Sequence, residues 1–220
     1  MLVANSLYKK LDYGPLRDLA PVVLVSTPPG LLVTKPLVPV KNVQELIAFA
    51  RSYPGKLNYA SPGSGTWNHL FAELFNAMAQ TKIVHVPYKG ASPAVTDLLG
   101  GQVQMMFSPI PPARPQVKSG RPRALAVSSE KRSGLLPEIP TVSESGLPAY
   151  TAEGWFAVLV PAKTPPAIIV RLNRELNRAL RRPEVKASLA AGGTPGELAR
   201  SIRDGSVKWG KLTRELGMSL

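Results

Sequence analysis

Glycine and hydroxyl side chains are concentrated in one short loop, residues 61–66, between an expected strand and an expected helix. Glycine lets backbone N–H groups come close to a ligand, and the three hydroxyl side chains add donors. The helix that follows offers unpaired N–H groups and a partial positive charge. This chemistry suits a carboxylate or a phosphate, although an ordinary capped turn explains the loop equally well. The candidate binding residues are Ser61, Gly63, Ser64, Gly65 and Thr66.

A second loop, residues 86–93, also leads from an expected strand to a helix N-terminus. In α/β folds, ligands bind beyond the carboxyl ends of strands, where both loops are expected to lie. Lys89 offers a cation to an anionic ligand, Tyr88 offers a hydrogen-bonding wall, and Gly90 completes the candidate set. The alternative is a lysine that points into solvent, as most lysines do. Trp155 is a further candidate wall of a cleft, or else a large core residue.

Catalytic and metal-binding patterns are weak in this sequence. The chain has no cysteine and two histidines, His69 and His85, and the pair His69 and Glu73 is too small a ligand set for a metal. His85 alternates with apolar residues, which favours a structural histidine. Ser64 lies in Gly-Ser-Gly rather than in a nucleophile elbow, and Asn68 replaces the third glycine of a dinucleotide-binding motif. We therefore expect no enzyme, no cofactor and no metal.

The chain is strongly basic, with a formal net charge of +13 and a pI of about 10.2. Nucleic acid, an anionic surface and small anions are the partners that such a charge can attract. No nucleic-acid motif accompanies the charge, so a nucleic-acid-binding protein is kept only as a minor alternative. No apolar run is long enough to cross a bilayer. One expected helix carries a cluster of arginines at positions 171, 174, 178, 181 and 182.

Short apolar runs alternate with helical periods along the chain, which indicates an α/β fold with a largely parallel sheet. Capping patterns mark helix starts at residues 42–45, 92–93, 141–144 and 194–197. The proline-rich stretch at residues 108–115 is interpreted as a connection. The expected strands are residues 21–25, 31–34, 57–60, 83–86, 103–107, 123–127 and 155–160.

Several segments, taken in order, resemble a known receptor family. They read YASPGSGT at residues 59–66, VHVPYKG at 84–90, DLLGGQV at 97–103 and RALAV at 123–127. The chain is similar in these segments to the Bug receptors, the extracytoplasmic solute receptors of tripartite tricarboxylate transporters. The resemblance covers nearly the whole chain.

The resemblance implies a two-lobed periplasmic-binding-protein fold of type II, with a ligand cleft between the lobes. Residues 39–150 would form the second lobe, and residues 1–38 and 151–220 the first. It further implies a small carboxylate ligand held by the two loops, membrane transporter subunits or a sensor as partners, and a periplasmic location.

The N-terminus departs from the family pattern. Residues 1–10 lack the order of a signal peptide, and the strand and Pro-Gly-Gly loop with which family members begin are not found. We therefore expect an N-terminally truncated receptor with an incomplete first lobe. An unpaired sheet edge there would favour a homo-oligomer, and the alternative function is a non-binding remnant or an oligomeric interaction protein.

Overall fold

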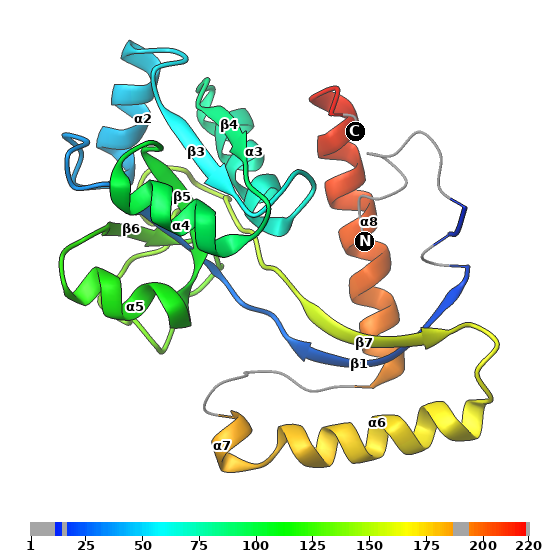
Figure 1. Ribbon diagram of the computed structural model, residues 1–220. Helices are drawn as coiled ribbons and strands as arrows, with labels where there is room; N and C mark the ends of the chain where they lie inside the picture. The colour runs from blue at the N-terminus through cyan, green and yellow to red at the C-terminus, as the bar shows by residue number, and fades with distance from the viewer. Residues whose placement is uncertain (1–11, 15–16, 187–193, 219–220) are drawn as a thin grey trace. The chain divides into compact units, whose positions relative to one another are not determined.

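The computed structural model describes residues 12–14, 17–186 and 194–218 of the 220-residue chain. The chain divides into two compact units (Figure 1). One unit is Pro28–Gly154, and the other takes the described residues of Met1–Thr27 and Trp155–Leu220. Residues 1–10, on which the signal-peptide interpretation rests, lie outside the described residues. None of the described helices has the length and apolar character needed to cross a membrane.

A five-stranded mixed sheet forms the centre of the unit Pro28–Gly154. Its spatial order is β4-β3-β5-β2-β6. Strand β3 pairs in parallel with β4 and β5, whereas β2 pairs antiparallel with β5 and β6. The expectation of a largely parallel sheet is thus only half met, because β2 lies between two strands that run the other way. The strands are β2 (Gly30–Thr34), β3 (Asn58–Ser61), β4 (Val84–Pro87), β5 (Met105–Pro109) and β6 (Arg123–Val127).

Four helices connect these strands, and helix α3 and helix α4 provide the crossovers that parallel pairing requires. The expected cap at Asn42 is confirmed, since its side chain accepts from the Glu45 N–H. Two other expectations are wrong. Helix α4 begins at Ala91 with Gly90 as its cap, not at Ser92, and residues 141–146 make capping-box contacts around a turn without forming a helix. The helices are α2 (Val43–Ser52), α3 (Trp67–Ala79), α4 (Ala91–Gly100) and α5 (Ile110–Lys118).

Alternate residues of the sheet face two apolar layers. One layer joins Leu31 and Met106 of the sheet to Leu98 of α4 and Ile110 of α5. The other layer is aromatic. In it, Phe107 of β5 packs against Phe71 of α3, with their ring centroids 6.0 Å apart. Both faces of the sheet are therefore covered by packed side chains.

The second unit contains a two-stranded antiparallel sheet with a small core around Val22, Val23 and Leu180. Ile168 and Leu172 stand at helical spacing with Leu176 and Leu180, which predicts that they face inward, but they are 48% and 36% exposed. The expected buried strand at 155–160 is only half-buried. Two strands cover too little area to bury more of these side chains. The elements are β1 (Leu19–Ser26), β7 (Phe156–Pro161), α6 (Pro166–Leu180), α7 (Pro183–Lys186) and α8 (Pro195–Glu215).

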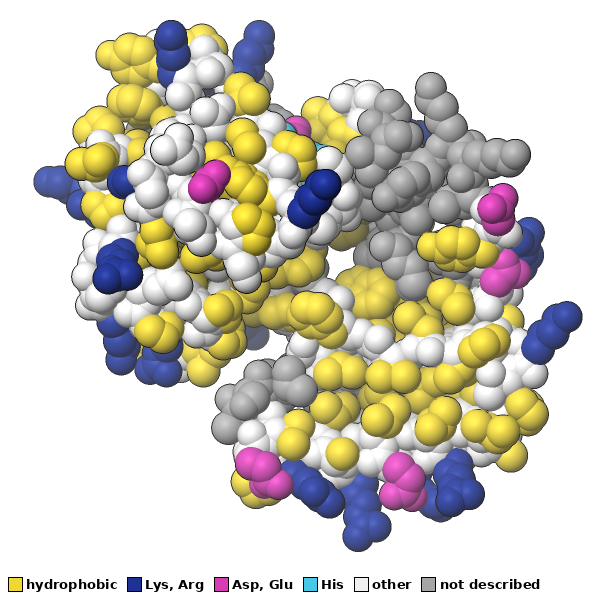
Figure 2. Space-filling view, viewed as in Figure 1, with side chains coloured by type: hydrophobic (Ala, Val, Ile, Leu, Met, Phe, Trp, Pro, Cys, Tyr) yellow, Lys and Arg dark blue, Asp and Glu magenta, His cyan; other side chains and the backbone are white. Residues whose placement is uncertain are grey.

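Charge and capping in this unit follow the sequence patterns. The capping box of Thr194 and Glu197 at the start of α8 is confirmed, with both hydrogen bonds present. The clustered arginines on α6 and just after it are exposed, and Figure 2 shows basic side chains along the outer side of this helix. They form a solvated face of the second unit rather than part of the two candidate loops.

The two ends of Pro28–Gly154 meet each other. The Gly154 N–H donates to the Pro28 carbonyl oxygen at 3.1 Å. Nearby, the buried Ser128 hydroxyl accepts from the Gly30 N–H at 2.7 Å and donates to the Ala152 carbonyl oxygen at 2.5 Å. The compact unit therefore starts earlier than the expected boundary at residue 39, because β2 belongs to its sheet. The assignment of these units to receptor lobes stays a prediction.

Candidate functional site

The two candidate loops lie side by side at the carboxyl ends of neighbouring parallel strands. We call residues 61–66 the first loop and residues 87–90 the second loop. Their backbones are joined by hydrogen bonds from Tyr88 N–H to Ser61 O at 2.9 Å and from Gly90 N–H to Pro62 O at 3.0 Å. A Cβ atom at Gly63 would lie 3.6 Å from the Tyr88 carbonyl oxygen, an ordinary van der Waals contact between the loops. The structure thus brings together loops that are separated in the sequence.

Each loop ends at a helix N-terminus that has no side-chain cap. Thr66 is the N-cap of α3 but its hydroxyl donates to Gly63 O at 2.7 Å, and Gly90 is the N-cap of α4. First-turn N–H groups therefore keep their capacity to donate to another acceptor. Two adjacent helix N-termini of this kind have the chemistry to attract an anion, since both present N–H groups and partial positive charge.

Ser61 holds the first loop from below. Its side chain is fully buried, and its Oγ lies 2.7 Å from His85 Nε2. The same oxygen donates to Gly63 O at 3.0 Å and accepts from Gly63 N–H at 3.2 Å. A direct hydroxyl contact from Ser61 to a ligand, expected from the sequence, gains no support from this geometry. The other first-loop candidates are half-buried at the surface of the unit.

Both histidines lie under the first loop and stack on each other. Their ring centroids are 3.9 Å apart with an interplanar angle of 13°. His69 Nδ1 accepts the Gly65 N–H at 3.0 Å. The pKa of each ring is lowered to about 4, by burial for both and, for His69, by the charge of His85 as a second cause. The alternation around His85 predicts its structural role, but the pair could not be found from the sequence, because the contact depends on β4 lying next to β3.

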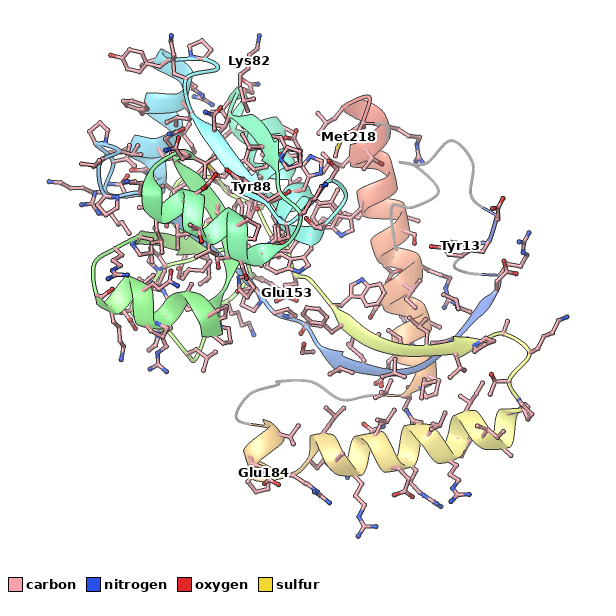
Figure 3. All side chains as sticks on the ribbon, viewed as in Figure 1. Tyr13, Lys82, Tyr88, Glu153, Glu184 and Met218 are labelled. Atoms are coloured by element: carbon pink, nitrogen blue, oxygen red, sulfur yellow. The ribbon has the colours of Figure 1, made fainter. Side chains whose placement is uncertain are left out.

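The tyrosine and the lysine of the second loop have different surroundings. The Tyr88 hydroxyl donates to Asp97 Oδ2 at 2.7 Å, so this side chain is anchored to α4 (Figure 3). The pKa of Tyr88 is raised to about 12, mainly by desolvation and secondly by the hydrogen bond to Asp97. Lys89 is exposed, and no carboxylate in the described part of the chain pairs with it. Lys89 is therefore the cation of this loop that a ligand can reach.

Two sequence candidates are placed differently. Asn68, at the position of the missing third glycine, is buried and donates from Nδ2 to Phe107 O at 2.7 Å. Trp155 belongs to the other unit, where it is half-buried just before β7, and its role in a cleft stays a prediction. Among the described side chains, no group of three His, Asp or Glu residues is arranged to hold a metal ion.

The family model for the tripartite tricarboxylate transporter family receptor matches residues 1–218. The chain belongs to this family. The resemblance that the sequence motifs indicated is thereby confirmed, as is the expectation that the protein is not an enzyme, since the family is one of receptors.

Two relatives of known sequence are longer than this chain. The UPF0065 protein in the tcbD-tcbE intergenic region of Pseudomonas sp. strain P51 is 39% identical over 98% of this chain and 66% of its own length. Protein BugT of Bordetella pertussis is 38% identical over 100% of this chain and 69% of its own length. The chain thus spans about two thirds of the length of these receptors.

Solved structures confirm the fold class. Rpa4515 of R. palustris, solved with adipate, superposes with a TM-score of 0.90 at 32% identity, covering 97% of this chain and 74% of that one. MatC (Rpa3494) of Rhodopseudomonas palustris, solved with bound malate, gives 0.86 at 29% identity over 96% and 74%. The periplasmic binding protein BugD gives 0.88 at 29% identity over 99% and 76%.

Proposed function

We propose that this chain binds a small carboxylate as the solute-binding part of a tripartite tricarboxylate-type transport receptor. The observation that carries the proposal is the pair of hydrogen-bonded loops at the N-termini of α3 and α4. A carboxylate oxygen placed over these two N-termini would accept hydrogen bonds from backbone N–H groups that the helices leave unpaired.

The site chemistry supports an anion rather than a neutral solute. Lys89 is exposed beside the loops, and the net charge of +13 attracts anions over a longer range. Gly63 and Gly65 carry no side chain that would block a ligand from the helix N-termini, although their own N–H groups donate to Ser61 Oγ and His69 Nδ1. The contact residues that we propose are Gly63, Ser64, Gly65, Thr66, Lys89 and Gly90, with Ser61 and Tyr88 holding the loops and Trp155 as a further wall.

The relatives support the class of ligand and the setting. Adipate and malate are the ligands of two similar receptors, so a short dicarboxylate is the first candidate here. The family description supports membrane transporter subunits as partners, and a sensor is the other partner that we consider. The same kinship supports a periplasmic location, since BugD is a periplasmic binding protein.

Isothermal titration calorimetry of the purified chain tests this proposal. The panel is acetate, malate, adipate and citrate, with the neutral diamide of adipate as the matched control. Saturable heat with at least one dicarboxylate, and none with the diamide, supports the proposal. Absence of saturable heat with every acid would show that this chain is a non-binding relative of the receptors.

Self-association is a separate proposal for the second unit. Its sheet has two strands, each with one edge unpaired by any described strand, and Phe156 and Val170 are more than half exposed. Such edges and apolar side chains favour pairing between copies. Size-exclusion chromatography with light scattering should give a mass above 23.6 kDa if copies pair.

A further inference from the structure

Two histidines, His69 buried and His85 half-buried, lie directly beneath the first loop, and carboxylate binding as described above does not use them. His69 on α3 and His85 on β4 are the only histidines of the chain, and each is bonded to a different residue of the loop. His69 accepts from the backbone of Gly65, and His85 contacts the hydroxyl of Ser61. The first loop is therefore fastened at two points by one stacked pair of rings.

The hydrogen bond to Gly65 fixes the protonation state of His69. A backbone N–H can only donate, so Nδ1 of His69 must carry a lone pair, and the neutral ring then has its proton on Nε2. A proton added to Nδ1 would face the Gly65 N–H with a second hydrogen and would break this contact. Protonation of His69 at Nδ1 and retention of its hydrogen bond to the loop therefore exclude each other.

The groups around the pair do not stabilise a positive charge. His85 is stacked at 3.9 Å, so two protonated rings would repel each other at close range. Tyr59 of β3 stacks on His85 at 4.9 Å, and its hydroxyl is committed to Glu73 of α3 at 2.5 Å. The Glu73 carboxylate thus already accepts a hydrogen bond from the phenol of Tyr59. Burial of the pair favours the neutral rings as well.

We propose that His69 and His85 are positioning residues that hold the first loop in its ligand-binding conformation while neutral, and that protonation of His69 releases the loop. This inference rests on the proposed carboxylate site, because the loop is part of it. Ligand affinity would then fall in acid because a group of the protein is protonated, in addition to any effect of protonating the ligand.

The direction of the pH effect follows from the lowered pKa. A released loop exposes His69 with an ordinary pKa near 6.5, whereas the held loop keeps the pKa at about 4. The held state is therefore fully favoured above pH 6.5 and is progressively lost as the pH falls toward 4. At pH 5 this difference shifts the ratio of released to held loop by up to about 30-fold for one histidine.

Two substitutions separate positioning from mere packing. His69→Asn places an amide oxygen near the position of Nδ1, so it keeps an acceptor for Gly65 but cannot be protonated. His85→Gln likewise keeps a polar atom for Ser61. The double variant contains no histidine at all, so its pH response between 4 and 7 lacks any histidine contribution. His69→Leu fills the space but offers no acceptor.

Calorimetry with adipate at pH 8 and pH 5 compares these proteins. The protonation of adipate itself weakens binding to all of them alike, so the comparison isolates the histidines. We expect the wild type to lose up to about 30-fold more affinity than the double variant between these pH values. His69→Leu should bind weakly at both pH values, and His69→Asn should restore binding. Equal losses in wild type and double variant would overturn the proposal.

Nuclear magnetic resonance supplies a readout that needs no ligand. Long-range ¹H–¹⁵N spectra of the wild type at pH 7.5 should show His69 as the Nε2–H tautomer, and the Gly65 amide signal should shift as His69 titrates. An Nδ1–H tautomer for His69, or a Gly65 amide signal that does not shift as His69 titrates, would refute the proposal. If adipate and the other acids fail to bind while these signals appear as expected, the proposed function fails and the hold on the loop stands.

Discussion

The backbone N–H of Gly90 donates a 3.0 Å hydrogen bond to the carbonyl oxygen of Pro62. Gly90 is the N-cap of α4, and Pro62 belongs to the loop that leads into α3. One bond therefore fixes the starts of two helices relative to each other. A ligand that touches both helix N-termini depends on that spacing, so changes at either residue should affect affinity as well as stability.

Gly90→Ala should destabilise the protein by about 1–3 kcal/mol and weaken dicarboxylate binding. Gly90 has φ 115° and ψ 172°, a conformation that is almost restricted to glycine. A Cβ there would meet no atom within 4 Å, so the cost is conformational rather than steric. Urea denaturation measures it. Gly100→Ala, in the helix and also free of close neighbours, is the matched control and should be neutral or slightly stabilising.

Lys89→Gln should weaken dicarboxylate binding by several-fold and leave the free energy of unfolding nearly unchanged. The reason is the loss of an exposed cation at the site, which is worth up to about 1 kcal/mol. Lys82→Gln removes the same charge just before the other end of β4 and serves as the control (Figure 3). Calorimetry at two salt concentrations distinguishes them. Equal affinity losses in both variants would mean that only the net charge matters.

Tyr88→Phe should cost about 0.5–1.5 kcal/mol of stability, because the Asp97 carboxylate loses the hydroxyl that donates to it at 2.7 Å. The second loop would then be less firmly held, and a modest loss of ligand affinity should accompany the loss of stability. The control is Tyr53→Phe, since Tyr53 is 53% exposed at the end of α2. Chemical denaturation and calorimetry on both variants suffice, and a Tyr53 variant that is equally weakened would contradict the assignment.

Ser128→Ala should destabilise the protein by about 1–3 kcal/mol. The substitution leaves the Gly30 N–H and the Ala152 carbonyl oxygen buried without their hydroxyl partner. Ser119→Ala is the control, since its hydroxyl is exposed and bonds only to Gln116 O. A shift in the urea midpoint confined to the Ser128 variant is the expected result, and a shift no larger than that of the control would be against it.

Local signals in the sequence predicted local structure well. The caps at Asn42 and Thr194 were readable because a side chain bonds to the backbone three residues on, within one turn. The proline-rich residues 108–115 misled, since they include the first turns of α5. Pro111 and Pro112 need no N–H in the first turn, and only Pro115 lies inside the helix.

Features that depend on neighbours in space could not be read in the same way. The direction of β2 is set by its insertion between β5 and β6, which no pattern inside Gly30–Thr34 encodes. The stacking of His69 on His85 likewise requires β4 beside β3. The two loops were found from their glycines and their position after strands, but the burial of Ser61 was not, because it depends on the histidine beneath it.

The closed ends of the unit Pro28–Gly154 have a consequence for the order in which the chain assembles. Strands β1 and β7 pair although the whole of that unit separates them in sequence. Joining them in an otherwise unfolded chain would carry the entropy cost of closing a very long loop. Once Pro28–Gly154 has folded, the contact between Gly154 and Pro28 has already closed that loop. The two candidate loops should therefore take their final conformation first, during synthesis, and the β1–β7 sheet should form only after Pro161 has left the ribosome.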